Sequence, residues 1–444
     1  MTAVLAEYVV TEASTLVFLV RPGEDEPRVV EIGLRRDELR RLVGDSFGGR
    51  SAERPRTADP DAWREPLDRL VAPIADVCGE GDQVWLVPGD VLHYVPMHAL
   101  RIGDVSLAER NPVCYTPSAS VMRYCRAKRR PDSGRSLVFA DSRATRPLSH
   151  ARDQAFAIAA RYGAELHTGA ATTRDLVEKR LTGEHLDVLH FACHGEFDQA
   201  DPMRSGVLLA GDDRLTAADL LRLPVNANLV TLSACESGVS AQRPGNELMG
   251  LTRALVYAGA SAVLVSLWSV DEISTNLLMQ YFYRALYDGA GKAAALRRAM
   301  LHVRDVTLAE VVAYGEEAIA RLDAVAPEHV GPDTRAQLAE DIADARYRAG
   351  DFPAALADYE HLLAASSPDA PTATATSPEP AEPPAGSSAG TAAGSSSRYT
   401  ALARAAARCR TVLRTGGGAT PDYGRQPFVH PYYWAPFVLV GDWR

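Results

Sequence analysis

A histidine and a cysteine, each at the end of an apolar segment, are the residues best placed to do chemistry. His194 and Gly195 follow the apolar segment 187–192, and Cys235 follows the apolar segment 229–234. Ligands of open parallel sheets bind beyond the carboxyl ends of the strands. The residues between the two segments leave room for one crossover connection, so two neighbouring strands could bring both side chains into one cleft.

Such a pair has the parts of a cysteine peptidase. The Cys235 thiolate would attack a peptide carbonyl carbon. The His194 imidazole would take the thiol proton and return it to the leaving amine. The backbone N–H groups of Gly195 and Cys235 are candidates to hold the oxyanion, each such donor being worth about 3 to 4 kcal/mol in the best-studied enzymes.

Other roles compete for the same residues. A cysteine after a buried strand is often a core residue, and a lone histidine is often structural. Four possible metal ligands also lie here, namely His190, Cys193, His194 and Cys235. On a strand, however, His190 and His194 would lie about 13 Å apart. Cys193 would face the side opposite His194, as a core thiol. We therefore expect no metal and no cofactor.

Short apolar strands alternate with helices from residue 136 onward, which predicts βαβ units and a mainly parallel sheet with helices on both faces. The predicted strands are 136–140, 187–192, 229–234 and 262–267. The predicted helices are 150–162, 246–257, 271–286 and 292–303. These residues, 131–303, form the predicted catalytic half.

Residues 1–130 are predicted to form a non-catalytic half of the same α/β fold. Their predicted strands are 15–20, 28–32 and 83–88, and their predicted helices are 35–43 and 61–77. Residues 421–444 contain an aromatic segment followed by an apolar predicted strand. A terminal segment this apolar should dock on the sheet and complete the catalytic half.

The remaining residues predict a helical insert. Residues 304–365 are alanine-rich, and 343–363 resemble a tetratricopeptide unit, with Gly350 and Asp351 at the turn. One such unit needs a neighbour to bury its apolar face, and a plain helical hairpin is the alternative. Residues 366–397 are rich in Ser, Pro, Ala and Gly and predict a disordered linker, which could also be a self-cleavage site. A helix and a loop are expected over 398–420.

Composition limits the function classes. The 444 residues are 46% hydrophobic and 23% charged, with a formal net charge of −10, which argues against nucleic acid or an anionic membrane as a partner. No apolar run is long enough to span a membrane, and the first residues lack the pattern of a signal peptide. The six cysteines form no C-x-x-C pair. We therefore expect a cytoplasmic protein with reduced thiols.

Several segments resemble the CHAT family of caspase-like cysteine peptidases, relatives of separase, caspases and gingipains. The matching segments are 87–100, 115–120, 189–195, 232–238, 247–260, 266–272 and 430–442. The resemblance implies a caspase-hemoglobinase-like three-layer αβα sandwich, with His194 and Cys235 as a dyad that needs no third member. Tetratricopeptide repeats usually precede the peptidase domain in that family, whereas the helices here interrupt it.

The loop that follows the strand 262–267 should border the substrate cleft, which makes Trp268, Asp271 and Glu272 candidate substrate-binding residues. The two acidic residues could pair with a basic side chain before the cut, as the similar loop of separase does. The alternative is that Asp271 caps the helix that follows it, a role that Asp often fills.

The sequence as a whole predicts a cysteine endopeptidase that cleaves a specific protein partner. The resemblance implies a regulated effector in bacterial defence or programmed cell death, with a regulatory protein possible at the tetratricopeptide-like insert. Two alternatives remain open. One is an idle scaffold that binds through the same insert, and the other is a thiol-dependent hydrolase of a small molecule.

Overall fold

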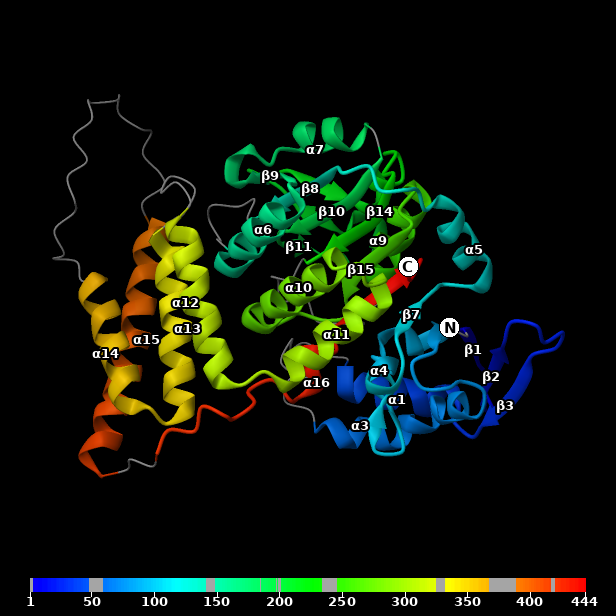
Figure 1. Cartoon of the computed structure of the whole chain (residues 1–444), viewed down its shortest axis with the longest axis horizontal. Helices are drawn as coiled ribbons and strands as arrows, with labels where there is room; N and C mark the ends of the chain where they lie inside the picture. The colour runs from blue at the N-terminus through cyan, green and yellow to red at the C-terminus, as the bar shows by residue number, and fades with distance from the viewer. Residues whose placement is uncertain are drawn as a thin grey trace. The chain divides into compact units, whose positions relative to one another are not determined.

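The computed structural model describes residues 3–47, 59–140, 148–183, 185–196, 198, 201–233, 246–324, 332–366, 389–416 and 420–444. The chain divides into a larger unit, residues 1–305 with 428–444, and a smaller unit, residues 306–427. The fold of each unit can be followed along the chain in Figure 1.

One large mixed sheet organises the larger unit. Its strand order among the described residues is β3-β2-β1-β4-β7-β16-β15-β14-β10-β8-β9. These strands are β1 (Ala3–Val10), β2 (Thr15–Val20), β3 (Arg28–Ile32), β4 (Gln83–Val87), β7 (Val113–Tyr115), β8 (Ser136–Ala140), β9 (Glu165–Thr168), β10 (Leu186–Ala192), β14 (Ala227–Leu232), β15 (Ala262–Ser266) and β16 (Phe437–Gly441). Most neighbouring strands are parallel; the antiparallel pairs are β1 with β2, β2 with β3, and β15 with β16. The predicted mainly parallel α/β sheet is confirmed.

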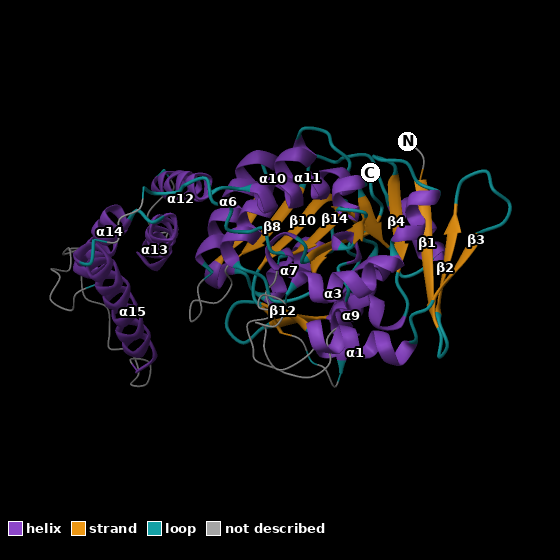
Figure 2. Cartoon of the chain, turned by 90° about the horizontal axis from the view of Figure 1, so that it is seen from below, coloured by secondary structure: helices purple, strands orange, loops and turns teal. Residues whose placement is uncertain are grey.

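Helices cover both faces of this sheet, which makes three layers (Figure 2). One face carries α6 (Ser149–Tyr162), α10 (Glu272–Tyr287) and α11 (Lys292–Asp305), and the other carries α1 (Arg36–Phe47), α3 (Pro60–Leu67) and α9 (Asn246–Ala258). Burial from both sides explains why β4, β8 and β14 are buried at every residue. Shorter helices of this unit are α4 (Leu107–Arg110), α5 (Ala119–Lys128), α7 (Arg174–Leu181), α8 (Ala217–Leu220) and α16 (Pro431–Trp434).

The strand β16 joins the two halves of the sheet. It lies between β7 and β15, antiparallel to β15 and parallel to β7. Its last residue, Gly441, has φ +107°, and a Cβ there would lie 2.5 Å from the Ser261 carbonyl oxygen, so only glycine fits. The expected docking of the terminal strand on the sheet is confirmed. The segments 1–130 and 131–303 share this one sheet.

The predicted helix over residues 61–77 is wrong beyond its first two turns. The helix α3 ends at Leu67, and two 3₁₀ turns, Asp68–Leu70 and Ala72–Asp76, replace the rest. Pro66, beside the end of α3, and Pro73, in the second 3₁₀ turn, explain the break, since neither has an N–H to donate inside a continuing helix.

Two small sheets complete the larger unit. The strands β11 (Gly195–Glu196), β12 (Gly206–Leu208) and β13 (Arg214–Thr216) form an antiparallel sheet directly after β10. The strands β5 (Arg101–Ile102) and β6 (Val105–Ser106) form a two-stranded hairpin.

The smaller unit is a series of helices in which each helix packs on the next. These are α12 (Leu308–Asp323), α13 (Pro332–Ala349), α14 (Phe352–Ala365) and α15 (Ala389–Arg414). Gly350, at φ +85°, forms the turn between α13 and α14, and Ala343, Ala355 and Tyr359 are buried in the core that these two helices share with α15. The expected tetratricopeptide-like helical insert is confirmed, with α12 and α15 as the neighbours that its hairpin requires.

The predicted linker 366–397 is too long at its C-terminal end. The helix α15 begins at Ala389, nine residues before the helix expected from 398. Intrinsic helix propensity does not explain this extension, because Gly, Ser and Thr fill six of the nine positions from 389 to 397. The self-cleavage hypothesis concerns residues 366–397, of which 367–388 lie outside the described residues, so it stays a prediction.

Candidate functional site

The strands that lead to His194 and Cys235 are direct neighbours. β10 and β14 pair in parallel, with Phe191 opposite Leu232. Beyond the end of β14, the Ser233 N–H still donates to the Phe191 carbonyl at 2.9 Å. The two segments that follow β10 and β14 therefore leave the sheet side by side, at the carboxyl ends of these strands, as the sequence predicted. We call this end of the sheet the carboxyl edge.

His194 lies just beyond this edge, between β10 and β11. Its side chain is buried, with 4% of its surface exposed. Its carbonyl oxygen accepts the Leu208 N–H at 2.8 Å, so the β12 strand fixes the backbone at the histidine. Cys235 lies outside the described residues, as does the segment 234–245, so the Cys235–His194 pair stays a prediction.

The geometry of Gly195 fits a role as an N–H donor. Gly195 pairs with Val207, and the flanking bond from the Leu208 N–H to the His194 carbonyl identifies this as a non-hydrogen-bonded pair. In such a pair the N–H groups point away from the partner strand. Because β11 is an edge strand, the Gly195 N–H points to the side where no further strand of the small sheet lies among the described residues.

The three predicted substrate-binding residues have different surroundings. The Asp271 carboxylate accepts the Ser274 N–H at 2.9 Å and caps α10, which is the alternative that the sequence left open. Glu272 is exposed in the first turn of that helix. Trp268 stacks between Phe47 and Tyr432, at centroid distances of 6.0 and 6.4 Å, and its indole N–H donates to the Tyr432 carbonyl. The ring thus has a packing role.

The competing metal ligands are engaged elsewhere. Cys193 is fully buried, and its thiol lies 3.5 Å from the Phe139 carbonyl oxygen of β8, as expected of a core thiol. Both ring nitrogens of His190 have partners, Tyr283 Oη at 2.9 Å and Gln154 Oε1 at 3.0 Å. Over the residues that the structure describes, no group of three or more His, Cys, Asp or Glu side chains could hold a metal ion.

Sequence reasoning missed the polar network around His190. The Tyr283 hydroxyl bonds both His190 Nδ1 and, at 2.7 Å, Thr231 Oγ1. Burial lowers the pKa of His190 to about 3, so the ring is neutral. Tyr283 and His190 are far apart in the sequence and no motif joins them, so only the packing of α10 on the sheet reveals the network.

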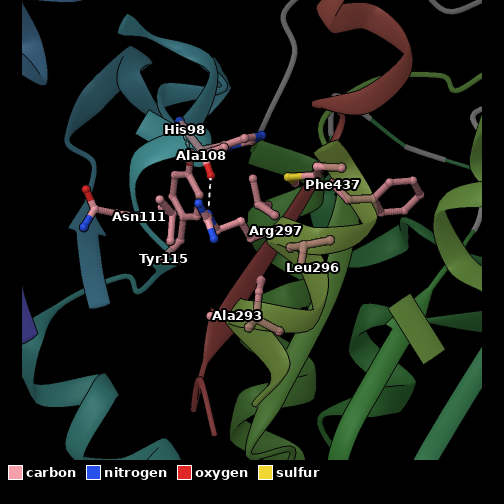
Figure 3. A pocket seen from close by; sticks show the side chains of 12 residues that line it. His98, Ala108, Asn111, Tyr115, Ala293, Leu296, Arg297 and Phe437 are labelled. Carbon is pink, nitrogen blue, oxygen red and sulfur yellow. Dashed lines mark hydrogen bonds between the residues drawn. The ribbon is translucent and has the colours of Figure 1, made fainter. Parts of the chain in front are cut away.

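A small pocket, whose lining does not include His194, is shown in Figure 3. It is lined by residues of α4, β7, α11 and β16, among them Tyr115 and Arg297, and by His98 of the 3₁₀ turn Met97–Ala99. The Tyr115 hydroxyl lies 2.8 Å from His98 Nδ1, and burial lowers the pKa of His98 to about 3. Arg297 Nε donates to the Ala108 carbonyl at 2.8 Å, so this arginine fastens α11 to α4. Of these contacts, the bond from Arg297 to Ala108 joins residues 131–303 to residues 1–130.

A search of the described helices for a membrane span, by length and hydropathy, finds no candidate.

Comparison with curated proteins finds two relatives. Tetratricopeptide repeat protein 28 of Mus musculus is 28% identical over 191 residues, which are 35% of this chain and 8% of that protein. Tetratricopeptide repeat protein 28 of Homo sapiens is 26% identical over 266 residues, which are 51% of this chain and 10% of that protein. The chain thus spans about a tenth of the length of these relatives or less.

Comparison with solved structures finds cysteine proteinases and related proteins at low similarity. The Arg-specific cysteine proteinase gingipain R matches with a TM-score of 0.36 and 11% identity, over 55% of this chain and 62% of that one. The Saccharomyces cerevisiae separase–securin complex matches with a TM-score of 0.37 and 13% identity, over 55% of this chain and 16% of that one.

The family comparison covers far more of the chain. The sequence model of the CHAT domain matches residues 63–442, which include the strands β10, β14 and β16, the His194 segment and the helical insert. This range includes strands from both halves of the large sheet. Of the elements described above, β1, β2, β3 and α1 lie wholly outside it. By this match over most of its length, the chain belongs to the CHAT domain family.

Proposed function

We propose that this chain is a cysteine endopeptidase that cuts a specific protein partner with Cys235 as nucleophile and His194 as base and acid. One observation carries the proposal: β10 and β14 are hydrogen-bonded parallel neighbours in a register that opposes Phe191 to Leu232. His194 and Cys235 each stand three positions beyond those opposed residues in the sequence. Because the two residues lie equally far beyond an opposed pair of strand residues, their side chains are favoured to meet at the carboxyl edge of the sheet.

The proposed reaction begins with proton transfer from the Cys235 thiol to the His194 imidazole. The thiolate sulfur attacks the peptide carbonyl carbon, and the carbonyl oxygen takes the negative charge. The Gly195 N–H, which points away from β12, is the proposed donor to that oxyanion. The imidazolium then protonates the leaving amine, and water releases the acyl group from sulfur as a carboxylic acid, with His194 accepting the water proton.

Burial of His194 supports regulated activity. A protein substrate needs access to the imidazole, yet only 4% of its surface is exposed. We propose that a partner bound at the tetratricopeptide-like helices of the smaller unit supplies the activating signal. We propose further that the enzyme acts in the cytoplasm as an effector of bacterial defence or programmed cell death, the role that its resemblance to caspase-like peptidases implies.

The test is a map of new protein N-termini after the full chain acts on a host extract. We expect cuts that disappear in Cys235→Ala and in His194→Ala and persist in Cys193→Ala, since Cys193 is a buried core thiol. Identical cuts from Cys235→Ala would exclude this residue as the nucleophile. A wild-type chain that makes no cuts, alone or with partner proteins from neighbouring genes, would favour the second candidate.

That second candidate is a catalytically idle scaffold. The series of helices α12 to α15 favours it, because tetratricopeptide-like helices are recognition surfaces that need no catalytic residue. A scaffold predicts that Cys235→Ala retains every function of the wild-type chain in the cell, whereas the endopeptidase predicts its loss.

A further inference from the structure

A buried side-chain bridge links the strands β10 and β14 by hydrogen bonds, four residues before the proposed catalytic pair. Tyr283, on α10, places its hydroxyl 2.9 Å from His190 Nδ1 on β10 and 2.7 Å from Thr231 Oγ1 on β14. His190 and Thr231 are directly opposed in the parallel ladder. We call these three residues, His190, Thr231 and Tyr283, the strand clamp.

The clamp stands at matched distances from the two proposed catalytic residues. His190 precedes His194 by four positions, and Thr231 precedes Cys235 by four positions. Along a strand this separation is about 13 Å, so the clamp touches neither the substrate nor the reacting atoms. It acts only on the relative position of the two strands that present them.

The hydrogen bonds of the clamp form one continuous buried chain. His190 Nε2 lies 3.0 Å from Gln154 Oε1, and His190 Nδ1 lies 2.9 Å from the Tyr283 hydroxyl. The Tyr283 hydroxyl in turn bonds Thr231 Oγ1 at 2.7 Å. Each polar atom of this fully buried chain then has a partner, and a shift of one strand would leave several without one.

The helix that carries Tyr283 is itself fixed to its neighbour α6. Asp153 Oδ2 accepts both the Asn276 and the Gln280 side-chain amides at 3.1 Å. The Tyr162 hydroxyl donates to the Tyr283 carbonyl at 3.1 Å. Tyr283 therefore contacts the sheet from a layer in which α6 and α10 are joined by hydrogen bonds. Figure 2 shows these two helices over β8 and β10.

We infer that Tyr283 and Thr231 are positioning residues that hold β10 and β14 in the register in which His194 and Cys235 meet. This inference rests on the proposed function. Small displacements of a catalytic pair are costly, since about 1 Å can lower a rate by about 100-fold. The clamp is a candidate for this precision because it links the two strands through side chains, in addition to their backbone ladder.

The test measures how fast iodoacetamide alkylates Cys235 in the full chain from pH 6 to 9, by mass spectrometry of the modified peptide. A thiol paired with an imidazole reacts with an apparent pKa below the ordinary value of about 8.5. We expect Tyr283→Phe and Thr231→Val to raise this apparent pKa and to slow alkylation at pH 7 by about 10-fold or more. Thr231→Ser, which keeps the hydroxyl, should restore the wild-type profile.

Two controls separate positioning from general loosening of the fold. Tyr8→Phe removes a buried tyrosine hydroxyl from the same large sheet, but that hydroxyl bonds the Leu70 carbonyl beside β1, far from β10 and β14 in the strand order, so this variant should keep the wild-type profile. Cys193 is fully buried and reports unfolding through its own alkylation. A variant whose Cys235 slows while Cys193 stays protected supports positioning. Slowing together with exposure of Cys193 in both Tyr283→Phe and Thr231→Val overturns it.

The outcomes also separate this inference from the function on which it rests. If His194→Ala changes the Cys235 profile but Tyr283→Phe and Thr231→Val do not, the positioning role is wrong and the catalytic pair stands. If His194→Ala leaves the profile of Cys235 unchanged, the catalytic pair itself is wrong.

Discussion

Asp271 Oδ1 accepts the Ser274 backbone N–H at 2.9 Å, so the carboxylate expected to bind substrate forms the N-cap of α10. The two roles are compatible in space, because the cap occupies one carboxylate oxygen and the residue is half-buried. They differ in what a substitution changes.

The Asp271 cap can be tested by stability. Asp271→Ala removes the acceptor for the Ser274 N–H and should lower the free energy of unfolding by about 1 kcal/mol. Asp271→Asn keeps an oxygen acceptor and should lower the free energy of unfolding by no more than about 0.3 kcal/mol. Urea unfolding of both variants checks the prediction. If Asp271→Asn keeps stability but loses cleavage after basic residues, then Asp271 also binds substrate, and equal losses from both variants contradict the cap.

A buried ion pair at the end of β16 should show a large interaction free energy in a double-mutant cycle of unfolding. Lys292 Nζ lies 3.3 Å from Asp442 Oδ2, with 4% and 1% of the two residues exposed. Lys292→Met leaves the buried carboxylate with Arg129, whose Nε lies 3.7 Å away, as its remaining ion-pair partner. The loss of unfolding free energy should therefore be about 3 kcal/mol, the lower end of the range for a broken buried pair. The double variant Lys292→Met/Asp442→Asn should recover a large part of that loss. Losses that simply add in the double variant would contradict the pairing.

Gly441 should tolerate no side chain. Gly441→Ala combines a left-handed φ of +107° with a Cβ only 2.5 Å from the Ser261 carbonyl oxygen. Gly289→Ala is the matched control, because its φ is +90° and nothing lies within 4 Å of its Cβ. We expect about 1 to 2 kcal/mol of destabilisation from the control and clearly more from Gly441→Ala, by thermal unfolding. Equal losses would mean that β16 can move to relieve the contact.

Two buried histidines should make the larger unit less stable in acid. Burial lowers the pKa of both His98 and His190 to about 3, whereas an unfolded histidine has a pKa of about 6.5. Below pH 6.5 the unfolded chain binds protons that the folded chain does not. The stability from each ring is therefore complete above pH 6.5 and falls by about 1.4 kcal/mol per pH unit toward pH 3.

The measurement for this prediction is the urea unfolding free energy between pH 5 and 6.5. Replacing His98 by Leu should reduce the mean slope over this range by about 1.1 kcal/mol per pH unit, because the unfolded imidazole is only half protonated at pH 6.5. A slope that matches the wild-type slope would show that His98 is protonated in the folded chain.

Several strands were predictable because their sequences are rich in apolar and β-branched residues and are bounded by turn residues. The predicted strands 15–20, 28–32 and 136–140 coincide with β2, β3 and β8, and the predicted terminal strand is β16. The edge strand β9, Glu165–Thr168, was missed, because its four residues contain one aliphatic side chain and give no period-2 pattern. The helix α7 was missed for a similar reason, since five of its eight residues are charged.

The candidate site was predictable only in part. A strand end followed by His and Gly is visible in the sequence, and the adjacency of β10 and β14 follows from the crossover between them. The dual contact of the Tyr283 hydroxyl is not visible, because it depends on where α10 crosses the sheet. The stacking of Trp268 between Phe47 and Tyr432 likewise joins three distant segments by packing alone.

The position of β16 has a consequence for how the chain is made. This strand is central in the large sheet, yet its residues are synthesised after the whole of the smaller unit. Until they leave the ribosome, β7 and β15 both present open backbone edges, and the pairing of Val440 with Tyr115 spans most of the chain. Because such distant pairing is slow to form, nascent chains stalled before residue 437 should recruit chaperones, while the helices α12 to α14 are already free to fold.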